Sequence, residues 1–176
     1  MGGAQYFIIP GLGNSGSEHW QTWFESQGPN VQRIQQQEWD APALADWLRS
    51  IDDTLKTADL DNTILIGHSL GCVTIAHWAK RSGKKIRGAM LVAPSDIEQP
   101  VYTFPATGFT PIPLDPLPFP SLVVSSADDP WVSPERAQFF AQCWGSRFVD
   151  IGKAGHINAV SGHYQWQEGL DLLYSL

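Results

Sequence analysis

Short apolar segments alternate along this chain with longer segments of helical spacing, and no other feature constrains the fold as strongly. Apolar segments bounded by turn residues predict six strands, at residues 6–9, 31–34, 63–66, 89–92, 122–124 and 148–151. Apolar residues at helical intervals predict helices at residues 18–26, 43–55, 70–81 and 134–144, with a fifth near 163–173. Strand and helix therefore follow one another over the whole chain.

This alternation predicts the fold class. Strands that alternate with helices are joined by right-handed crossovers, which make the strands parallel and place helices on both faces of the sheet. The predicted strands are apolar almost throughout, as strands covered on both faces are. We therefore predict an α/β fold, a three-layer α/β/α sandwich with about six mostly parallel strands, formed by a single domain over residues 1–176.

Residues 94–120 interrupt the pattern. They contain prolines at positions 94, 100, 105, 111, 113, 116, 118 and 120 and follow neither a helical nor a strand period. Long connections without regular structure are uncommon in compact domains and often form lids or binding loops. We expect an ordered loop here that influences substrate size.

Composition excludes several classes of protein. Eighteen acidic residues against eleven Lys and Arg give a formal net charge of −7, which disfavours partners such as nucleic acid and anionic membrane surfaces. No apolar run approaches the roughly 20 residues of a membrane helix, and the first residues lack the features of a signal peptide. We expect a cytoplasmic protein, and nothing in the sequence indicates an oligomeric state.

The two cysteines, Cys72 and Cys143, lie far apart in the sequence and have no metal-site spacing to histidines. Neither a disulfide framework nor a zinc site is indicated, so we expect two buried thiols. No cofactor is expected on the main interpretation.

The segment Gly67-His68-Ser69-Leu70-Gly71 follows a predicted strand and precedes a predicted helix. This is the Gly-x-Ser-x-Gly pattern in the context that a nucleophilic serine requires, because the glycines permit a sharp turn that exposes the hydroxyl above the sheet. We expect Ser69 to be the nucleophile and His68 to be structural. An ordinary turn rich in small residues is the alternative.

A serine hydroxyl needs an adjacent base, and the base needs an acid to orient it. In α/β-hydrolases these groups follow in the order serine, acid, histidine. Here Asp128 and Asp129 follow the fifth predicted strand, and His156 follows the sixth. Because the carboxyl ends of parallel strands meet at one edge of the sheet, we expect these groups to lie close to Ser69.

Backbone amides must also stabilise the oxyanion that forms during acyl transfer. Such donors usually come from the residue after the nucleophile and from the loop after an early strand, which nominates Leu70 and Leu12.

Another interpretation concerns the loop that contains Leu12. Gly11, Gly13 and Gly16 match the Gly-x-Gly-x-x-Gly pattern of NAD(P)-binding proteins, with Glu38 some way beyond. Pro10 before the first glycine, a helix that starts late and a short chain all count against that interpretation.

The chain resembles the small α/β-hydrolases of the retinoblastoma-binding protein 9 and YdeN group, also called the serine hydrolase family. The resemblance rests on motifs spread over nearly the whole chain, namely Pro10-Gly11, His19-Trp20, Trp39-Asp40-Ala41-Pro42, the Ser69 motif, Asp128-Asp129-Pro130 and Gly155-His156. It implies a compact core without a helical cap and a triad of Ser69, His156 and Asp129. Asp129 is favoured over Asp128 because the family places the acid three residues before a valine, here Val132.

These features predict a cofactor-free serine hydrolase that cleaves small-molecule esters, thioesters or amides through an acyl-enzyme on Ser69. Transfer of the acyl group to an acceptor other than water fits the same residues, and so does a non-catalytic interaction module on this fold. Trp131 and His19 are candidates for the substrate pocket, although a packed or capping role is favoured for His19 because it lies next to Trp20 in the first helix turn. Trp39 and Trp47 suit either a pocket or the core.

Overall fold

The six predicted strands form one sheet in the computed structural model, which describes residues 3–176. Its order is β2-β1-β3-β4-β5-β6, and every neighbouring pair is parallel, which confirms the predicted fold class. The strands are β1 (Gln5–Ile9), β2 (Val31–Arg33), β3 (Thr63–His68), β4 (Gly88–Val92), β5 (Ser121–Ser125) and β6 (Arg147–Asp150).

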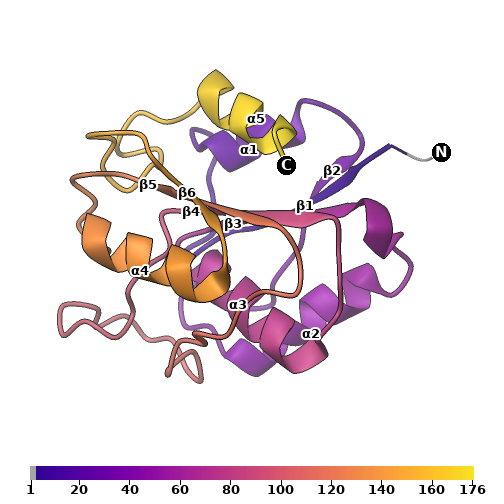
Figure 1. Cartoon of the computed structure of the whole chain (residues 1–176), viewed down its shortest axis with the longest axis horizontal. Helices are drawn as coiled ribbons and strands as arrows, with labels where there is room; N and C mark the ends of the chain where they lie inside the picture. Colours follow the sequence, from indigo (N-terminus) through magenta and orange to yellow (C-terminus); the bar gives the residue numbers. More distant parts are fainter. Residues whose placement is uncertain (1–2) are drawn as a thin grey trace.

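Five α-helices cover the sheet, α1 and α5 on one face and α2, α3 and α4 on the other (Figure 1). They are α1 (Trp20–Glu25), α2 (Leu44–Leu55), α3 (Leu70–Ser82), α4 (Pro134–Trp144) and α5 (Gln167–Tyr174). The first helix begins later than predicted because the His19 side chain caps it, accepting a hydrogen bond from the amide of Gln21. The 3-10 turn η1 (Leu60–Asn62) was not predicted.

Each face of the sheet has its own apolar core. Under α2, α3 and α4 the core contains three fully buried tryptophans, Trp47, Trp78 and Trp144. Under α1 and α5 it is built around Trp20 and a neighbouring group of aromatic residues. Burial on both faces explains why the central strands β3, β4 and β5 are buried at every position and lack a two-residue alternation.

The long connection between β4 and β5 contains neither helix nor strand, as predicted, and carries no helical cap within the described residues. One isolated bridge pairs Ala43 with Thr107. The segment is held by hydrogen bonds from other elements, since Trp144 Nε1 donates to the carbonyl of Pro113 at 2.7 Å and His77 Nε2 donates to that of Phe109 at 2.8 Å. These contacts make it an ordered loop.

A sharp bend joins β3 to α3 at Ser69, whose backbone lies at φ 57° and ψ −121°. This conformation is rare for a residue with a side chain. Glycines on either side allow the chain to pack closely there. A Cβ atom on Gly71 would lie 2.1 Å from the carbonyl oxygen of Ile9, and one on Gly67 would lie 3.0 Å from the amide nitrogen of Cys72. The motif therefore forms the predicted strand–turn–helix bend.

Neither cysteine in the described residues forms a disulfide. Cys72 is buried, but Cys143 on α4 is only partly buried, so the prediction of two buried thiols is wrong for Cys143. None of the helices found between residues 3 and 176 is long and apolar enough to cross a membrane.

Candidate active site

The structure brings Ser69, His156 and Asp129 together at the carboxyl edge of the sheet. Ser69 Oγ lies 2.9 Å from His156 Nε2, and His156 Nδ1 lies 2.9 Å from both carboxylate oxygens of Asp129. Because a carboxylate only accepts hydrogen bonds, Nδ1 carries the ring proton and donates it to Asp129. The unprotonated Nε2 can then accept the proton of the Ser69 hydroxyl.

Each of the three side chains follows a different strand. Ser69 comes directly after β3, Asp129 lies in the turn after β5, and His156 lies in the loop after β6. β5 neighbours β6 in the sheet, and β4 separates β5 from β3. All three residues are nearly buried, with exposed fractions of 8–9%. The parallel sheet thus gathers groups separated by 87 positions in sequence.

The two adjacent aspartates have different roles. Asp129 faces His156 and also accepts a hydrogen bond from the amide of Trp131 at 2.8 Å. Asp128 points instead to the loop that carries His156, where it accepts hydrogen bonds from the amide of Gly155 at 2.8 Å and the hydroxyl of Ser126 at 2.9 Å. The bond from Gly155 is the main reason that the pKa of Asp128 is lowered.

Leu70 and Leu12, the predicted oxyanion donors, lie next to the bend at Ser69. Leu70 is the first residue of α3, so its amide has no partner within the helix. Leu12 follows Gly11, which packs so closely on the bend that a Cβ atom there would lie 2.8 Å from Ser69 Cβ. Within residues 3–176 neither amide donates a hydrogen bond to a protein acceptor.

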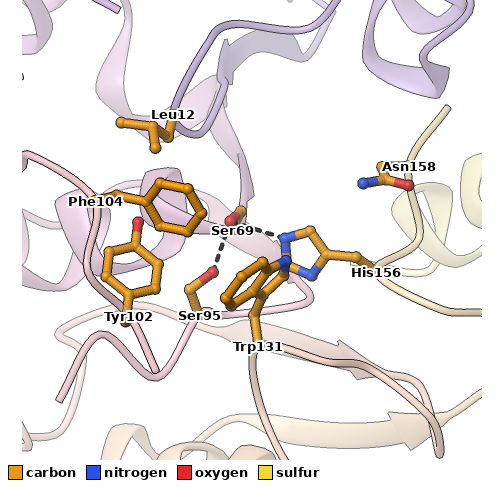
Figure 2. A pocket seen from close by; sticks show the side chains of 8 residues that line it. All are labelled: Leu12, Ser69, Ser95, Tyr102, Phe104, Trp131, His156 and Asn158. Carbon is orange, nitrogen blue, oxygen red and sulfur yellow. Dashed lines mark hydrogen bonds between the residues drawn. The ribbon is translucent and has the colours of Figure 1, made fainter. Parts of the chain in front are cut away.

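Ser95 is a site residue that the sequence analysis missed. Its hydroxyl lies 2.6 Å from Ser69 Oγ, and the residue is 1% exposed (Figure 2). It follows the end of β4, the strand between those that carry Ser69 and Asp129. That position at the carboxyl edge is the one sequence signal that could have identified it.

Two further histidines lie behind the site. His68 Nε2 donates a 2.9 Å hydrogen bond to the backbone carbonyl of His156 and therefore holds the base in place. The ring of His19 packs against that of His68, with centroids 4.8 Å apart. Burial is the main cause that lowers the pKa of His19 to about 3 and that of His68 well below its ordinary value. Both rings are therefore neutral at physiological pH.

A cavity of about 240 Å³ opens beside Ser69. Figure 2 shows the residues that line it, with two aromatic side chains facing Ser69 from the side opposite His156. The lining consists of Leu12, Ser69, Ser95, Tyr102, Phe104, Trp131, His156 and Asn158. Trp131 lines the cavity as predicted, and Tyr102 and Phe104 bring the long loop to the site.

His19, in contrast, does not line this cavity and takes the capping role that the sequence favoured for it over a place in the pocket. Its Nδ1 accepts the capping hydrogen bond from the amide of Gln21 at 3.1 Å, and its ring lies against Trp20 and His68. Trp47 is fully buried in the core. Trp39 is half-buried against the same core and lines no part of the cavity.

The glycine-rich loop at residues 11–16 is held by hydrogen bonds to other parts of the chain. The guanidinium of Arg33 donates hydrogen bonds to the side chain of Asn14 at 2.8 Å and to the carbonyl of Ser15 at 2.7 Å. Gly13 donates its amide to the carbonyl of Trp39. The Gly13 contact takes up a backbone donor of the kind that a phosphate-binding loop would need. Within residues 3–176, no three His, Cys, Asp or Glu side chains cluster in a way that could hold a metal ion.

Comparison with known proteins relates the whole chain to hydrolases. A family model described as serine hydrolase matches residues 6–175. The crystal structure of a YdeN-like hydrolase from Pectobacterium atrosepticum is 38% identical, with a TM-score of 0.87 over 98% of this chain and 90% of the other. Among curated proteins, no sequence matches the chain.

More distant structures share the fold. The ydeN gene product of Bacillus subtilis is 22% identical, with a TM-score of 0.81 over 98% of this chain and 97% of the other. The thioesterase RedJ of the prodiginine biosynthetic pathway of Streptomyces coelicolor is 16% identical, with a TM-score of 0.69 over 97% and 89% of the two chains.

Acidification below about pH 6.5 should lower the stability of the protein. That is the ordinary pKa of His19 and His68, so the unfolded chain takes up protons there, whereas the folded protein keeps both rings neutral. The unfolded state then binds more protons, and the stability present above that pH is lost as pH falls. Each histidine contributes a slope of about 1.4 kcal/mol per pH unit once its unfolded form is protonated.

His19→Asn isolates one part of this effect, because the asparagine oxygen can still cap α1 while the titrating ring is removed. The free energy of unfolding, measured in urea between pH 6 and pH 4.5, should fall less steeply in this variant by about 1 kcal/mol per pH unit. Arg33, His68, His156 and His163 still face the position, and the lowered pKa values of His68 and His163 retain the rest of the slope. Equal slopes for the two proteins would contradict the account.

Proposed function

The chain is a hydrolase of the serine hydrolase family, and on that basis we propose that it cleaves small esters, thioesters or amides through an acyl-enzyme on Ser69. The observation that carries the proposal is the unbroken hydrogen-bonded series from Ser69 Oγ through His156 to Asp129. A non-catalytic interaction module would have no need for this arrangement beside an open cavity.

Acylation begins with attack of Ser69 Oγ on the substrate carbonyl carbon. His156 Nε2 takes the hydroxyl proton as the new C–O bond forms, and Asp129 stabilises the imidazolium and keeps the ring oriented. The amides of Leu12 and Leu70 donate hydrogen bonds to the oxyanion of the tetrahedral intermediate. His156 then returns the proton to the leaving group as its bond to the carbonyl carbon breaks.

Deacylation repeats these steps with water. His156 removes a proton from a water molecule that attacks the acyl carbon, and the proton passes to Ser69 Oγ as the acyl product leaves. The enzyme returns to its starting state without a cofactor. Transfer to another acceptor would use the same residues with a different nucleophile in place of water.

A fluorophosphonate probe tests this assignment directly. The folded wild type should be labelled at Ser69, and Ser69→Ala should remain unlabelled at that peptide. Asp129→Asn should be labelled at least about 100-fold more slowly, because the amide no longer holds the correct tautomer of His156.

Asp128→Asn is the matched control, because it changes the neighbouring carboxylate in the same way but keeps an oxygen that accepts from Gly155. Its labelling rate should fall by less than about tenfold. Absence of labelling in folded wild type, or equal rates for the two aspartate variants, would overturn the proposed triad.

A further inference from the structure

Two aromatic side chains separate the cavity beside Ser69 from a second cavity of about 210 Å³. Tyr102 and Phe104 line both spaces, with ring centroids 5.0 Å apart in an edge-to-face arrangement. Phe104 also contacts Trp131 edge to face, with centroids 5.2 Å apart. Beyond this pair the second cavity is lined by Ile97, Ala106, Phe109 and Thr110. Tyr102 and Phe104 therefore form a wall within the long loop.

A third cavity, of about 290 Å³, indicates where the two halves of a substrate lie. It is lined by His156 and Trp131 but not by Ser69, together with Pro130, Gly155, Asn158, Val160 and Ser161. The leaving group must receive its proton from His156, so we place the leaving group in this third cavity. The acyl group, bonded to Ser69, then extends into the cavity that ends at the wall.

The lining of these cavities limits the charge of the substrate. No Asp, Glu, Lys or Arg side chain lines any of the three cavities. Burial raises the pKa of the Tyr102 hydroxyl to about 12, so that group is also neutral. With a net charge of −7, the chain offers little attraction to an anionic substrate such as a coenzyme A thioester.

We propose that this site, if it acts as described under Proposed function, takes neutral esters with a short apolar acyl group and that Tyr102 and Phe104 set the upper length. At roughly 30 Å³ for each water-sized group, a cavity of about 240 Å³ holds about eight non-hydrogen atoms. Removing the wall would join the two cavities and roughly double that space.

The test measures kcat/KM for p-nitrophenyl esters from acetate to dodecanoate. In the wild type the value should be greatest between butanoate and octanoate and at least about tenfold lower for dodecanoate. Phe104→Ala should raise the dodecanoate value relative to butanoate by about tenfold or more. Phe104 is 41% exposed on a loop, so this variant should fold, and its Tm verifies that.

Phe139→Ala is the matched control, because Phe139 is similarly exposed at 38% but lies on α4 and lines none of these cavities. It should keep the wild-type dependence on chain length. An unchanged profile in folded Phe104→Ala, or faster cleavage of an acyl-coenzyme A than of the matching neutral ester, overturns this proposal alone. Absence of cleavage for every ester together with absence of Ser69 labelling overturns the proposed function itself.

A separate observation concerns Ser95, whose hydroxyl lies 2.6 Å from Ser69 Oγ. Because the Ser69 proton is directed to His156, Ser95 must be the donor in this pair. Within the described residues Ser69 Oγ thus has two side-chain partners, one that accepts its proton and one that donates to it. This arrangement fixes the position of the oxygen beside the cavity.

We infer that Ser95 stabilises the negative charge that develops on Ser69 Oγ. During attack the oxygen gives its proton to His156 while it bonds to the carbonyl carbon. During deacylation that bond breaks, and the oxygen leaves with the electron pair until His156 returns the proton. A hydrogen bond to a charged oxygen is stronger than one to a neutral hydroxyl, so the Ser95 contact strengthens in both transition states.

Ser95→Ala should therefore lower kcat for p-nitrophenyl butanoate by about ten- to a hundredfold with little change in KM. The rate of fluorophosphonate labelling should fall similarly, and Ser95→Thr, which keeps a hydroxyl, should recover part of both losses.

Ser121→Ala controls for the loss of a buried serine pair, because Ser121 Oγ lies 2.6 Å from Ser146 Oγ at the start of β5, away from the site. It should reduce stability but leave kcat unchanged. Wild-type kcat in Ser95→Ala, or a loss confined to KM, would contradict the inference.

Discussion

The backbone bend at Ser69 is the constraint on which the rest of the site depends. Its φ of 57° and ψ of −121° lie outside the regions that L-residues favour, at a cost of roughly 1–3 kcal/mol. Close packing of β3 and α3 maintains it, because Gly71 lies directly against the carbonyl of Ile9 and leaves no room for a side chain. The bend points the hydroxyl out of the sheet and leaves the amide of Leu70 without a helical partner.

Hydrogen bonds hold the loop that contains His156, the general base. His68, the residue before Ser69, donates to the carbonyl of His156, so the bend and the base loop are connected directly. Asp128 and Ser126 bind the amides of Gly155 and Ala154 in that loop. The acid beside the orienting aspartate therefore serves the same site indirectly, by holding the loop in which the histidine lies.

Much of this arrangement could be predicted from the sequence, because it depends on local patterns. Apolar strands and helical intervals identified the sheet, and the motif around Ser69 identified the bend. Ser95 and the wall formed by Tyr102 and Phe104 could not be predicted, since a loop without periodicity gives no indication of which side chains face inward. Both roles stayed open for His19 because a capping histidine and a pocket histidine look alike in sequence, and the structure shows the capping role. The structure distinguishes Asp129 from Asp128 by their hydrogen-bond partners, His156 and Gly155. In the sequence, only a family pattern favoured Asp129.

The most direct test of the account is to trap the intermediate. Wild-type protein mixed with p-nitrophenyl butanoate should be quenched in acid within one turnover and digested for mass spectrometry. The peptide containing Ser69 should gain the mass of one butanoyl group, and this adduct should disappear when the substrate is exhausted. An adduct on another residue, or rapid ester cleavage without any adduct on Ser69, would contradict it.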